Sequence, residues 1–418
     1  MPHNGHATED AAFEDAARTA LATVFARPRH EWELDERTLL DTLACIAHAH
    51  QEPLIVRESR LRGLPRTLVL NGAVDGVGVR DAAFVNAAFA HGQDFDDTQL
   101  STTAHVSSVV WAALLAAAPP EADGARLAEA SAAGRRFLRM LSAFVVPRHL
   151  RAGWHATGTT ASLAAVVALG VLLSDEATTW RAVGIAGSLI GGLRANNMTS
   201  LKALHAGRAA ENAVWALDLA RQPGWAGTPS VAALGRGMGF ADTGRLLPDA
   251  REDADVLAKK YPTCSGTHPA IELALAERDR LAAADAIELT VPPLVAEETT
   301  NAWPDSLPQA RMGLAFTVAL ALTAGRVDDA ALRTGLGDRA VRSVFDRIAV
   351  RIEPDEPEPA RYEPWARIES ARVGREQGLV VPTDADIRRK WQAAGDRPTP
   401  TPLKSMATLG QALGELPR

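Results

Sequence analysis

The stretch KKYPTCSGTHPAIELALAERD, residues 259–279, separates two parts of the chain that have different hydrophobic patterns. Before it, alanine-rich segments such as AAFEDAARTALATVFA (residues 11–26) repeat apolar residues at the helical period of about 3.6. After it, AIELTVPP (286–293) and RIAVRIEP (347–354) alternate apolar and polar residues, as strands do. The change predicts a mainly α protein, with a large all-helical domain and a smaller α+β domain whose strands we expect to be antiparallel.

The boundaries of these domains follow from the same patterns. We place the helical domain at residues 1–258 and the α+β domain at residues 259–394. Two more strand-like segments lie at 366–373 and 378–383, and a Pro-rich linker, GDRPTPTP, lies at 395–402. The amphipathic segment LKSMATLGQALGEL (403–416) predicts a last helix, so that residues 395–418 complete the helical domain.

Composition limits the function classes. The 418 residues are 47% hydrophobic with a net charge of −7 and no basic block, which argues against a nucleic-acid partner. The longest apolar run, residues 162–173, is too short to span a membrane, and residues 1–10 have no apolar signal region. Two cysteines, Cys45 and Cys264, form no disulfide framework and suit a reducing compartment. These features predict a cytoplasmic protein.

Lysine is rare in this chain. Of 44 basic residues only five are lysines, so 44 − 5 = 39 are arginines; the lysines are Lys202, Lys259, Lys260, Lys390 and Lys404. An ammonium group is compact and can give up a proton when it is desolvated, which a guanidinium does not do readily. The retained lysines therefore indicate specific roles, and ordinary surface positions are the alternative.

The first polar motif is DFDDTQLSTTAHVSS, residues 94–108. If the preceding helix continues into this stretch, His91, Asp94 and Thr98 lie on one face. Asp96 then points elsewhere, and we expect Asp96→Asn to matter less than Asp94→Asn. The pattern favours one wall of an acid/base site, and a solvated acidic helix end is the alternative.

A metal site is not expected in this motif. A calcium loop needs oxygen ligands at alternate positions and a glycine at the turn, which DFDDTQL lacks. A helical zinc site needs histidines at helical spacing, which His91 and His105 do not provide.

A second motif is GWHATGTTAS, residues 153–162, which precedes an apolar helix. Threonines such as Thr157 can cap this helix, and free backbone N–H groups at a helix start bind anions. His155 at this position could contact an anion and move a proton. A helix cap with a structural histidine is the alternative.

Two more motifs carry cations. In SLKALHAGRAAENA (200–213), Lys202, His205 and Arg208 fall close together around a helix and suit an anionic ligand. The junction stretch 259–279 offers a further polar set: Lys259, Lys260, Tyr261, Cys264 and His268. Cys264 has cationic neighbours, but a thiol nucleophile also needs a paired base, which the sequence alone does not identify.

The four motifs, in this order, resemble the MmgE/PrpD family across nearly the whole chain. The resemblance implies a large helical domain with a smaller α+β lid, a homodimer, and chemistry with no metal and no organic cofactor. It implies catalytic roles for Asp94, His105, His155, Lys202 and Lys259. It implies substrate-binding roles for Thr98, Thr157, His205, Arg208, Lys260, Tyr261, Cys264 and His268, and the two sets together are expected to line one pocket.

The resemblance also implies a reaction class. Members of this family act on small di- and tricarboxylates through a carbanion next to a carboxylate, which cations stabilise. At Cys264 the decarboxylase branch carries a histidine, so a lyase that dehydrates its substrate is expected ahead of a decarboxylase. An epimerase or isomerase and a catalytically silent ligand-binding homologue are the alternatives.

Overall fold

The computed structural model describes residues 7–49, 53–63, 76–223, 231–240, 245–249, 255–354, 362–368, 384–393 and 405–408. The chain forms two compact units. Unit 1 contains the described parts of Met1–Gly92, Asp96–Leu257 and Asp384–Arg418; unit 2 contains Gln93–Phe95 and the described parts of Ala258–Thr383. The expected fold class, mainly α with a smaller α+β part, is confirmed.

Some of the sequence expectations fall outside these ranges. The strand expected at 378–383 and the linker at 395–402 are not described, and of the last helix (403–416) only residues 405–408 are. The domain boundaries at residues 258 and 394 stay predictions.

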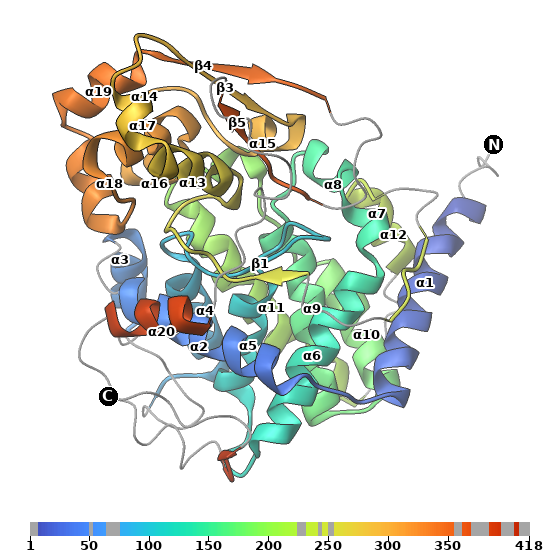
Figure 1. Ribbon diagram of the computed structural model, residues 1–418. Helices are drawn as coiled ribbons and strands as arrows, with labels where there is room; N and C mark the ends of the chain where they lie inside the picture. Colours follow the sequence, from blue (N-terminus) through green and yellow to red (C-terminus); the bar gives the residue numbers. More distant parts are fainter. Residues whose placement is uncertain are drawn as a thin grey trace. The chain divides into compact units, whose positions relative to one another are not determined.

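Unit 1 is built almost entirely from helices (Figure 1). They are α1 (Ala7–Ala26), α2 (Trp32–His48), α3 (Pro53–Leu61), α4 (Val79–His91), α5 (Val106–Ala117), α6 (Gly124–Met140), α7 (Ser142–Val145), α8 (Arg148–Arg151), α9 (Ala156–Leu173), α10 (Glu176–Gly187), α11 (Leu201–Arg221), α12 (Val231–Gly237) and α20 (Asp384–Ala393). A 3-10 turn, η2 (Arg194–Asn196), precedes α11, and two short strands, β1 (Thr98–Gln99) and β2 (Val256–Leu257), pair antiparallel.

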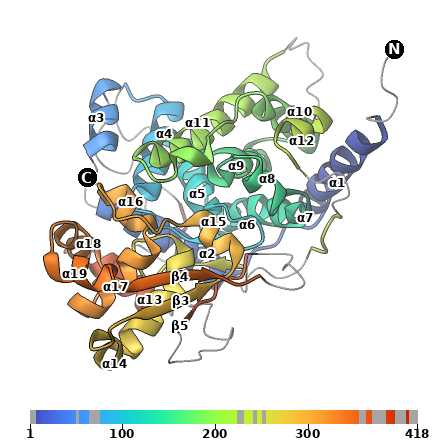
Figure 2. The same ribbon diagram turned by 90° about the horizontal axis from the view of Figure 1, so that it is seen from above.

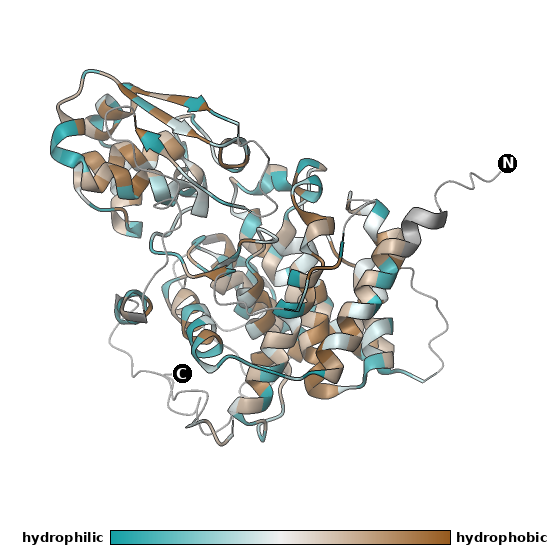
Figure 3. Cartoon of the chain, turned by 45° about the vertical axis from the view of Figure 1, so that its right-hand side comes forward, coloured by the Kyte–Doolittle hydropathy of each residue, from teal (hydrophilic) through white to brown (hydrophobic). Residues whose placement is uncertain are grey.

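Helix α9 is the centre of unit 1. It packs against α5, α6, α10 and α11, which surround it in Figures 1 and 2. Of its residues 89% are buried, and although α9 is long and apolar enough to cross a membrane, that burial is typical of a core helix. The central helices of this unit are themselves rich in hydrophobic residues, drawn in brown in Figure 3. Small residues permit the close packing: a Cβ on Gly134 of α6 would lie only 2.4 Å from the Ala164 carbonyl of α9.

Unit 2 combines short helices with a three-stranded sheet. Its elements are η3 (Ser265–Thr267), α13 (His268–Ala276), α14 (Arg278–Ala282), β3 (Ile287–Val291), α15 (Pro293–Glu298), α16 (Leu307–Met312), α17 (Leu314–Ala324), α18 (Asp329–Gly335), α19 (Arg339–Phe345), β4 (Ile348–Ile352) and β5 (Arg367–Ile368). The sheet order is β4-β3-β5. Helix α17 is buried and packs on α13 and α19.

The expectation of an antiparallel sheet was wrong for one of its two pairings. Strand β3 pairs parallel with β4, with Ile287 opposite Ile348, and antiparallel with β5, with Leu289 opposite Ile368. The chain between β3 and β4 carries α15 to α19, and such a long helical crossover lets two strands run in the same direction.

Candidate functional site

The acidic motif does not continue the helix that precedes it. Helix α4 ends at His91, and Gly92 is its C-cap. Asp94 has a φ of 51°, in the left-handed region that few residues other than glycine and Asn or Asp adopt. The expected helical phase through this stretch was therefore wrong, and with it the expectation that Asp96 could face solvent. Asp96 is buried, with 1% of its surface exposed.

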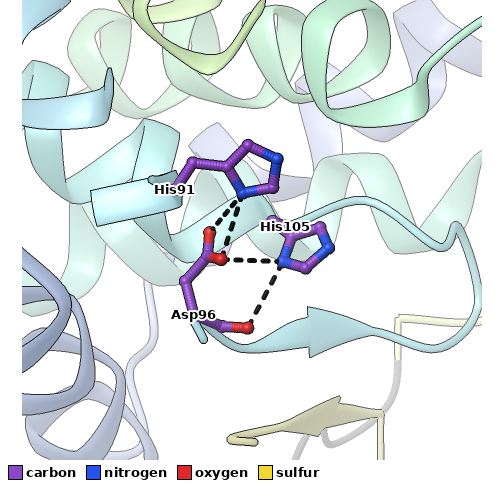
Figure 4. Close-up of side chains that lie close together, drawn as sticks. All are labelled: His91, Asp96 and His105. Carbon is purple, nitrogen blue, oxygen red and sulfur yellow. Dashed lines mark hydrogen bonds and ion pairs between the residues drawn. The ribbon is translucent and has the colours of Figure 1, made fainter. Parts of the chain in front are cut away.

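Asp96 binds two histidines of unit 1 (Figure 4). Its carboxylate oxygens lie 3.0 and 2.9 Å from Nδ1 of His91, at the end of α4. One of these oxygens is 3.1 Å from Nδ1 of His105, which precedes α5, and the Asp96 carbonyl is 3.3 Å from the same nitrogen. Both imidazoles therefore point their Nδ1 atoms at one carboxylate.

The charge state of Asp96 fixes the tautomers of these histidines. Burial raises the pKa of Asp96, but the charges and hydrogen bonds of His105 and His91 outweigh burial and hold it well below its usual value of 3.8. An ionised carboxylate only accepts hydrogen bonds, so both Nδ1 atoms carry a proton. In the neutral imidazoles Nε2 is then the basic atom.

Two further histidines, His155 and His205, extend this set. Nδ1 of His155 lies 3.1 Å from Nδ1 of His205, so one of these nitrogens donates and the other accepts. The ring of His91 stacks on that of His155 with centroids 5.6 Å apart, and it contacts His105 at 4.5 Å. We call His91, Asp96, His105, His155 and His205 the imidazole cluster.

The two outer histidines of the imidazole cluster are neutral near pH 7. Burial lowers the pKa of His155 well below 6.5, and the charges of His91 and Lys202 lower it further. Burial also lowers the pKa of His205 to about 4, again with help from His91 and Lys202. Lys202 is buried near the start of α11. Neutral imidazoles beside a buried ammonium can accept a proton or share one.

Glycines allow His205 to approach His155. A Cβ on Gly158 would lie 2.6 Å from the Gly191 carbonyl and 3.0 Å from Cβ of His205. Gly192 has a φ of +134°, its carbonyl accepts the His155 N–H at 2.9 Å, and a Cβ there would lie 3.1 Å from Cγ of His205. Side chains at these positions would push the two imidazoles apart.

Part of the imidazole cluster also has the composition of a metal site. Within the part of the chain that the structure describes, His91, Asp96 and His105 can offer three ligand atoms that all lie within 4.8 Å of one another. The N–O distances of 2.9–3.1 Å are those of direct hydrogen bonds between the side chains. Absence of a metal stays a prediction.

In unit 2, Asp94 and Lys259 form a buried ion pair. Nζ of Lys259 lies 2.5 Å from Oδ1 of Asp94 and 2.9 Å from its backbone carbonyl. His268 is buried in the same unit, and burial together with the charge of Lys259 lowers its pKa to about 3. An imidazole with this pKa is neutral near pH 7.

The other predicted residues of unit 1 have varied surroundings. Thr98 lies in β1, where its buried Oγ1 has no hydrogen-bond partner among the described residues. The Thr157 hydroxyl accepts a hydrogen bond from the His105 N–H at 3.1 Å and so helps to hold that histidine. Arg208 is exposed and pairs with Glu211 at 2.8 Å, so it does not join Lys202 in a buried cationic cluster.

The other predicted residues of unit 2 are Lys260 and Tyr261, which lie near the Glu272 carboxylate, and Cys264. Lys260 and the Tyr261 hydroxyl each lie 2.6 Å from the same oxygen of Glu272. Cys264 is buried, and its N–H donates to the Arg311 carbonyl at 2.9 Å. The convergence of the residues of the two units on one pocket stays a prediction.

Sequence reasoning missed several residues around the imidazole cluster. His91 and Asp96 were noticed but assigned no role, because the helical phase was misjudged. Asp41 and Lys390 were not connected to the motif, and their contacts are described below. The scarcity of lysine was the one signal that could have singled out Lys390.

Comparison with known proteins agrees with the motifs. The MmgE/PrpD N-terminal domain matches residues 23–244, just over half of the 418 residues. Cis-aconitate decarboxylase from Mus musculus is 29% identical over 303 residues, which are 66% of this chain and 61% of that protein. Cis-aconitate decarboxylase from Homo sapiens is 31% identical over 222 residues, 49% of this chain and 46% of that protein. The alignments thus span less than two thirds of either relative, but the domain match is sufficient to conclude that the chain belongs to the MmgE/PrpD family.

Proposed function

We propose that this protein is a cytoplasmic lyase that acts on a small di- or tricarboxylate through a carbanion next to a carboxylate, with neither metal nor organic cofactor. The observation that carries the proposal is the imidazole cluster, in which one ionised carboxylate fixes the protons of two histidines. Such a buried set has the parts that acid/base catalysis requires, a base with a defined tautomer and neighbouring groups that hold a proton.

Within the cluster, we assign the role of base to His105. Its side chain keeps 8% of its surface exposed, whereas that of His91 is fully buried. With Nδ1 donating to Asp96, Nε2 of His105 is the atom that can accept a proton from a substrate carbon. His91 then serves mainly to hold the other side of the Asp96 carboxylate.

Lys202 supplies positive charge near the two outer histidines of the imidazole cluster. Its charge lowers the pKa of both His155 and His205, so it acts over the region that they occupy. The same charge would attract a substrate carboxylate and stabilise the enolate-like electron pair that forms when the proton leaves. Lys259 and Asp94 of unit 2, which form a buried ion pair, are proposed to bind substrate.

The leading reaction is dehydration. His105 takes the proton from the carbon next to a carboxylate, the electron pair forms the new double bond, and the hydroxide on the neighbouring carbon leaves. The neutral His155–His205 pair accepts the proton that His105 has taken and passes it to that hydroxide, so that water is released. Decarboxylation is the second candidate, because both relatives are decarboxylases by name. There the electrons of the C–CO₂ bond form the carbanion, and His105 in its protonated form gives a proton to that carbon.

The test is incubation with a panel of hydroxylated and unsaturated di- and tricarboxylates in deuterated water, followed by NMR. We expect one acid to lose water or CO₂, and His105→Asn to be slower by about 100-fold, a typical contribution of general acid–base catalysis. His30→Asn is the matched control, since His30 lies outside the imidazole cluster. Deuterium exchange without net turnover would identify an epimerase, and a wild-type protein inert to every acid would overturn the proposal.

The homodimer is also proposed rather than observed. Leu193 and Leu201, on either side of η2 in unit 1, are 53% and 44% exposed, and we propose that the partner subunit covers them. Light scattering at micromolar concentration is expected to give twice the chain mass of 44.3 kDa, and a monomeric mass would exclude the dimer.

A further inference from the structure

Lys390 is one of the five lysines of this arginine-rich chain, and no motif of the site includes it. It lies on α20, the helix with which the chain returns to unit 1 after unit 2. Its side chain is only 3% exposed. Burying an ammonium is costly unless a partner compensates the charge, so this position calls for a specific explanation.

The partner of Lys390 is Asp41 on α2. Nζ of Lys390 lies 2.6 Å from Oδ1 of Asp41, whose side chain is 1% exposed. Burial lowers the pKa of Lys390, but the negative charge of Asp41 outweighs burial and raises it above 10.5, while burial raises the pKa of Asp41 above 3.8. Two turns further along α2, Nε2 of His48 donates to the backbone carbonyl of Lys390 at 2.8 Å. Helix α20 is thus fixed to α2 at two points.

Asp41 connects this ion pair to the acidic motif. Its second carboxylate oxygen, Oδ2, accepts the backbone N–H of Asp97 at 3.1 Å. Asp97 directly follows Asp96, whose carboxylate orients His91 and His105. A continuous series of contacts therefore runs from Lys390 through Asp41 and the Asp97 backbone to the imidazole cluster.

The Lys390 ammonium compensates negative charge in a region that contains several buried carboxyl groups. The negative charge of Asp96 raises the pKa of Asp41, and the charges of Asp41 and Asp96 both raise the pKa of Asp97. Without Lys390, Asp41 would remain as an uncompensated carboxylate beneath the loop that holds Asp96. The lysine therefore lets Asp41 stay ionised and keep its hydrogen bond to Asp97.

We propose that Lys390 and Asp41 are positioning residues of the active site: they fix the backbone at Asp97 and thereby the Asp96 carboxylate that sets the tautomer of His105. The expected effect on kcat rests on the proposed function. The expected effect on the position of Asp96 and on the His105 tautomer does not. The competing explanation is that the buried pair only stabilises the contact between α20 and α2.

Two double variants separate these explanations. Lys390→Met with Asp41→Asn removes both charges but leaves an amide oxygen that can accept the Asp97 N–H. Lys390→Met with Asp41→Leu removes the same charges and leaves that N–H without its acceptor. Both variants replace the buried ion pair with neutral groups of similar size, a change that buried pairs often tolerate without loss of stability. The lone Lys390→Met variant is less informative, because it leaves Asp41 uncompensated and can fail to fold.

The first measurement is steady-state kinetics on the acid identified by the panel. The Asn-containing double variant is expected to keep kcat within threefold of wild type, and the Leu-containing one to lose at least about tenfold in kcat with little change in KM. A pH profile should also shift for the Leu variant, because the His105 tautomer is no longer fixed. Arg136→Met is the matched control: it breaks the buried pair with Asp249 elsewhere in unit 1 and should lower stability without shifting the pH profile.

The second measurement does not depend on activity. In ¹⁵N-histidine-labelled, ligand-free protein, the Nδ1–H signals of His91 and His105 are expected in wild type and in the Asn variant, and lost or broadened in the Leu variant. Equal kcat values and equal imidazole spectra for the two double variants would overturn the proposal. If wild type converts no carboxylate, the proposed function fails, while the spectra still decide whether Lys390 and Asp41 position the cluster.

Discussion

Asp94 and Asp96 are two residues apart in the chain and have opposite surroundings. Asp96 belongs to unit 1 and accepts hydrogen bonds from the imidazoles of His91 and His105. Asp94 belongs to unit 2 and pairs with the ammonium of Lys259. An imidazole can exchange its proton near neutral pH, whereas an ammonium paired with a carboxylate stays charged.

The difference between the two sites teaches that one short motif can serve two tasks. The unit 1 site is suited to moving protons, and the unit 2 pair to presenting fixed charge. The backbone separates them, because α4 ends at His91 and Asp94 adopts a left-handed conformation. The following predictions test this division of tasks.

The largest effect is expected in unit 2, on stability. Lys259→Met leaves the buried Asp94 carboxylate without its ammonium partner, and breaking a buried pair in this way destabilises a protein by about 3–5 kcal/mol. The double variant Lys259→Met with Asp94→Asn should recover most of that loss. Urea unfolding gives both free energies. Additive losses in the double-mutant cycle would mean that the pair is not coupled, and the comparison with unit 1 would then lose its basis.

The next effect is expected in unit 1, on catalysis. Asp96→Asn offers one amide oxygen in place of a carboxylate that accepts from two imidazoles, and its NH₂ group favours the wrong tautomer of His105. We expect kcat to fall by about 100-fold, the upper range for groups that orient a functional histidine. Asp123→Asn is the matched control, because Asp123 only caps α6 and asparagine caps equally well. Activity of Asp96→Asn near that of the control would remove the proton-transfer role from the imidazole cluster.

Lys202→Arg sharpens the contrast between a compact ammonium and a planar guanidinium. The charge is retained, but the larger fork does not fit the space of a buried ammonium and does not readily give up a proton. We expect a loss of about tenfold in kcat/KM, equivalent to about 1.4 kcal/mol, with a normal circular dichroism spectrum. Wild-type activity in this variant would show that Lys202 supplies only general positive charge.

A further prediction concerns the pH dependence of stability and Asp97, which follows Asp94 and Asp96 in the acidic motif. Burial, reinforced by the negative charge of Asp41, raises the pKa of Asp97 from 3.8 to about 8. Because the folded state holds this proton more tightly than the unfolded state, its contribution to stability is complete below pH 3.8 and is lost as the pH rises through about 8.

The measurement is urea unfolding of wild type and Asp97→Asn at pH 6 and pH 7. Wild type should lose about 1 kcal/mol more than the variant over this interval, since the limiting slope for one proton is about 1.4 kcal/mol per pH unit. Asp346→Asn, at the exposed end of α19, is the control. Parallel stability curves for wild type and Asp97→Asn would show that Asp97 is ionised in the folded protein.

The hydrophobic pattern of the sequence predicted which helices and strands form better than it predicted where they end or which strands pair. Apolar periodicity identified the helices around α9, because each buries a face that the sequence displays. It did not indicate that α4 ends at His91, since Gly92 can either continue or end a helix. Nor could it predict that β3 and β4 run parallel, because the pairing depends on a long crossover rather than on either strand.

The candidate site was predictable to a similar extent. Asp94, His105, His155, Lys202 and Lys259 were singled out by their motifs, and the structure gives each of them a buried position. The partners that hold them were not predictable, because they come from elsewhere in the chain. Lys390 is 349 residues from Asp41, and only the folded chain brings the two together.

The smallest expected effect is that of metal chelation on activity. It tests whether the imidazole cluster moves protons or holds a metal ion. If His91, Asp96 and His105 held a zinc ion, each ligand atom would lie about 2.0–2.2 Å from a common point. Instead both Nδ1 atoms donate directly to the carboxylate at 2.9–3.1 Å, and a metal held by these same atoms would have to replace those protons. Dialysis against EDTA should therefore leave kcat unchanged within twofold, and added Zn²⁺ should inhibit if it enters. Loss of activity with EDTA that one metal restores would make the cluster a metal centre. The contrast between a proton-moving site and a fixed-charge site would then have to be abandoned, because a metal-bound cluster in unit 1 would also present fixed charge.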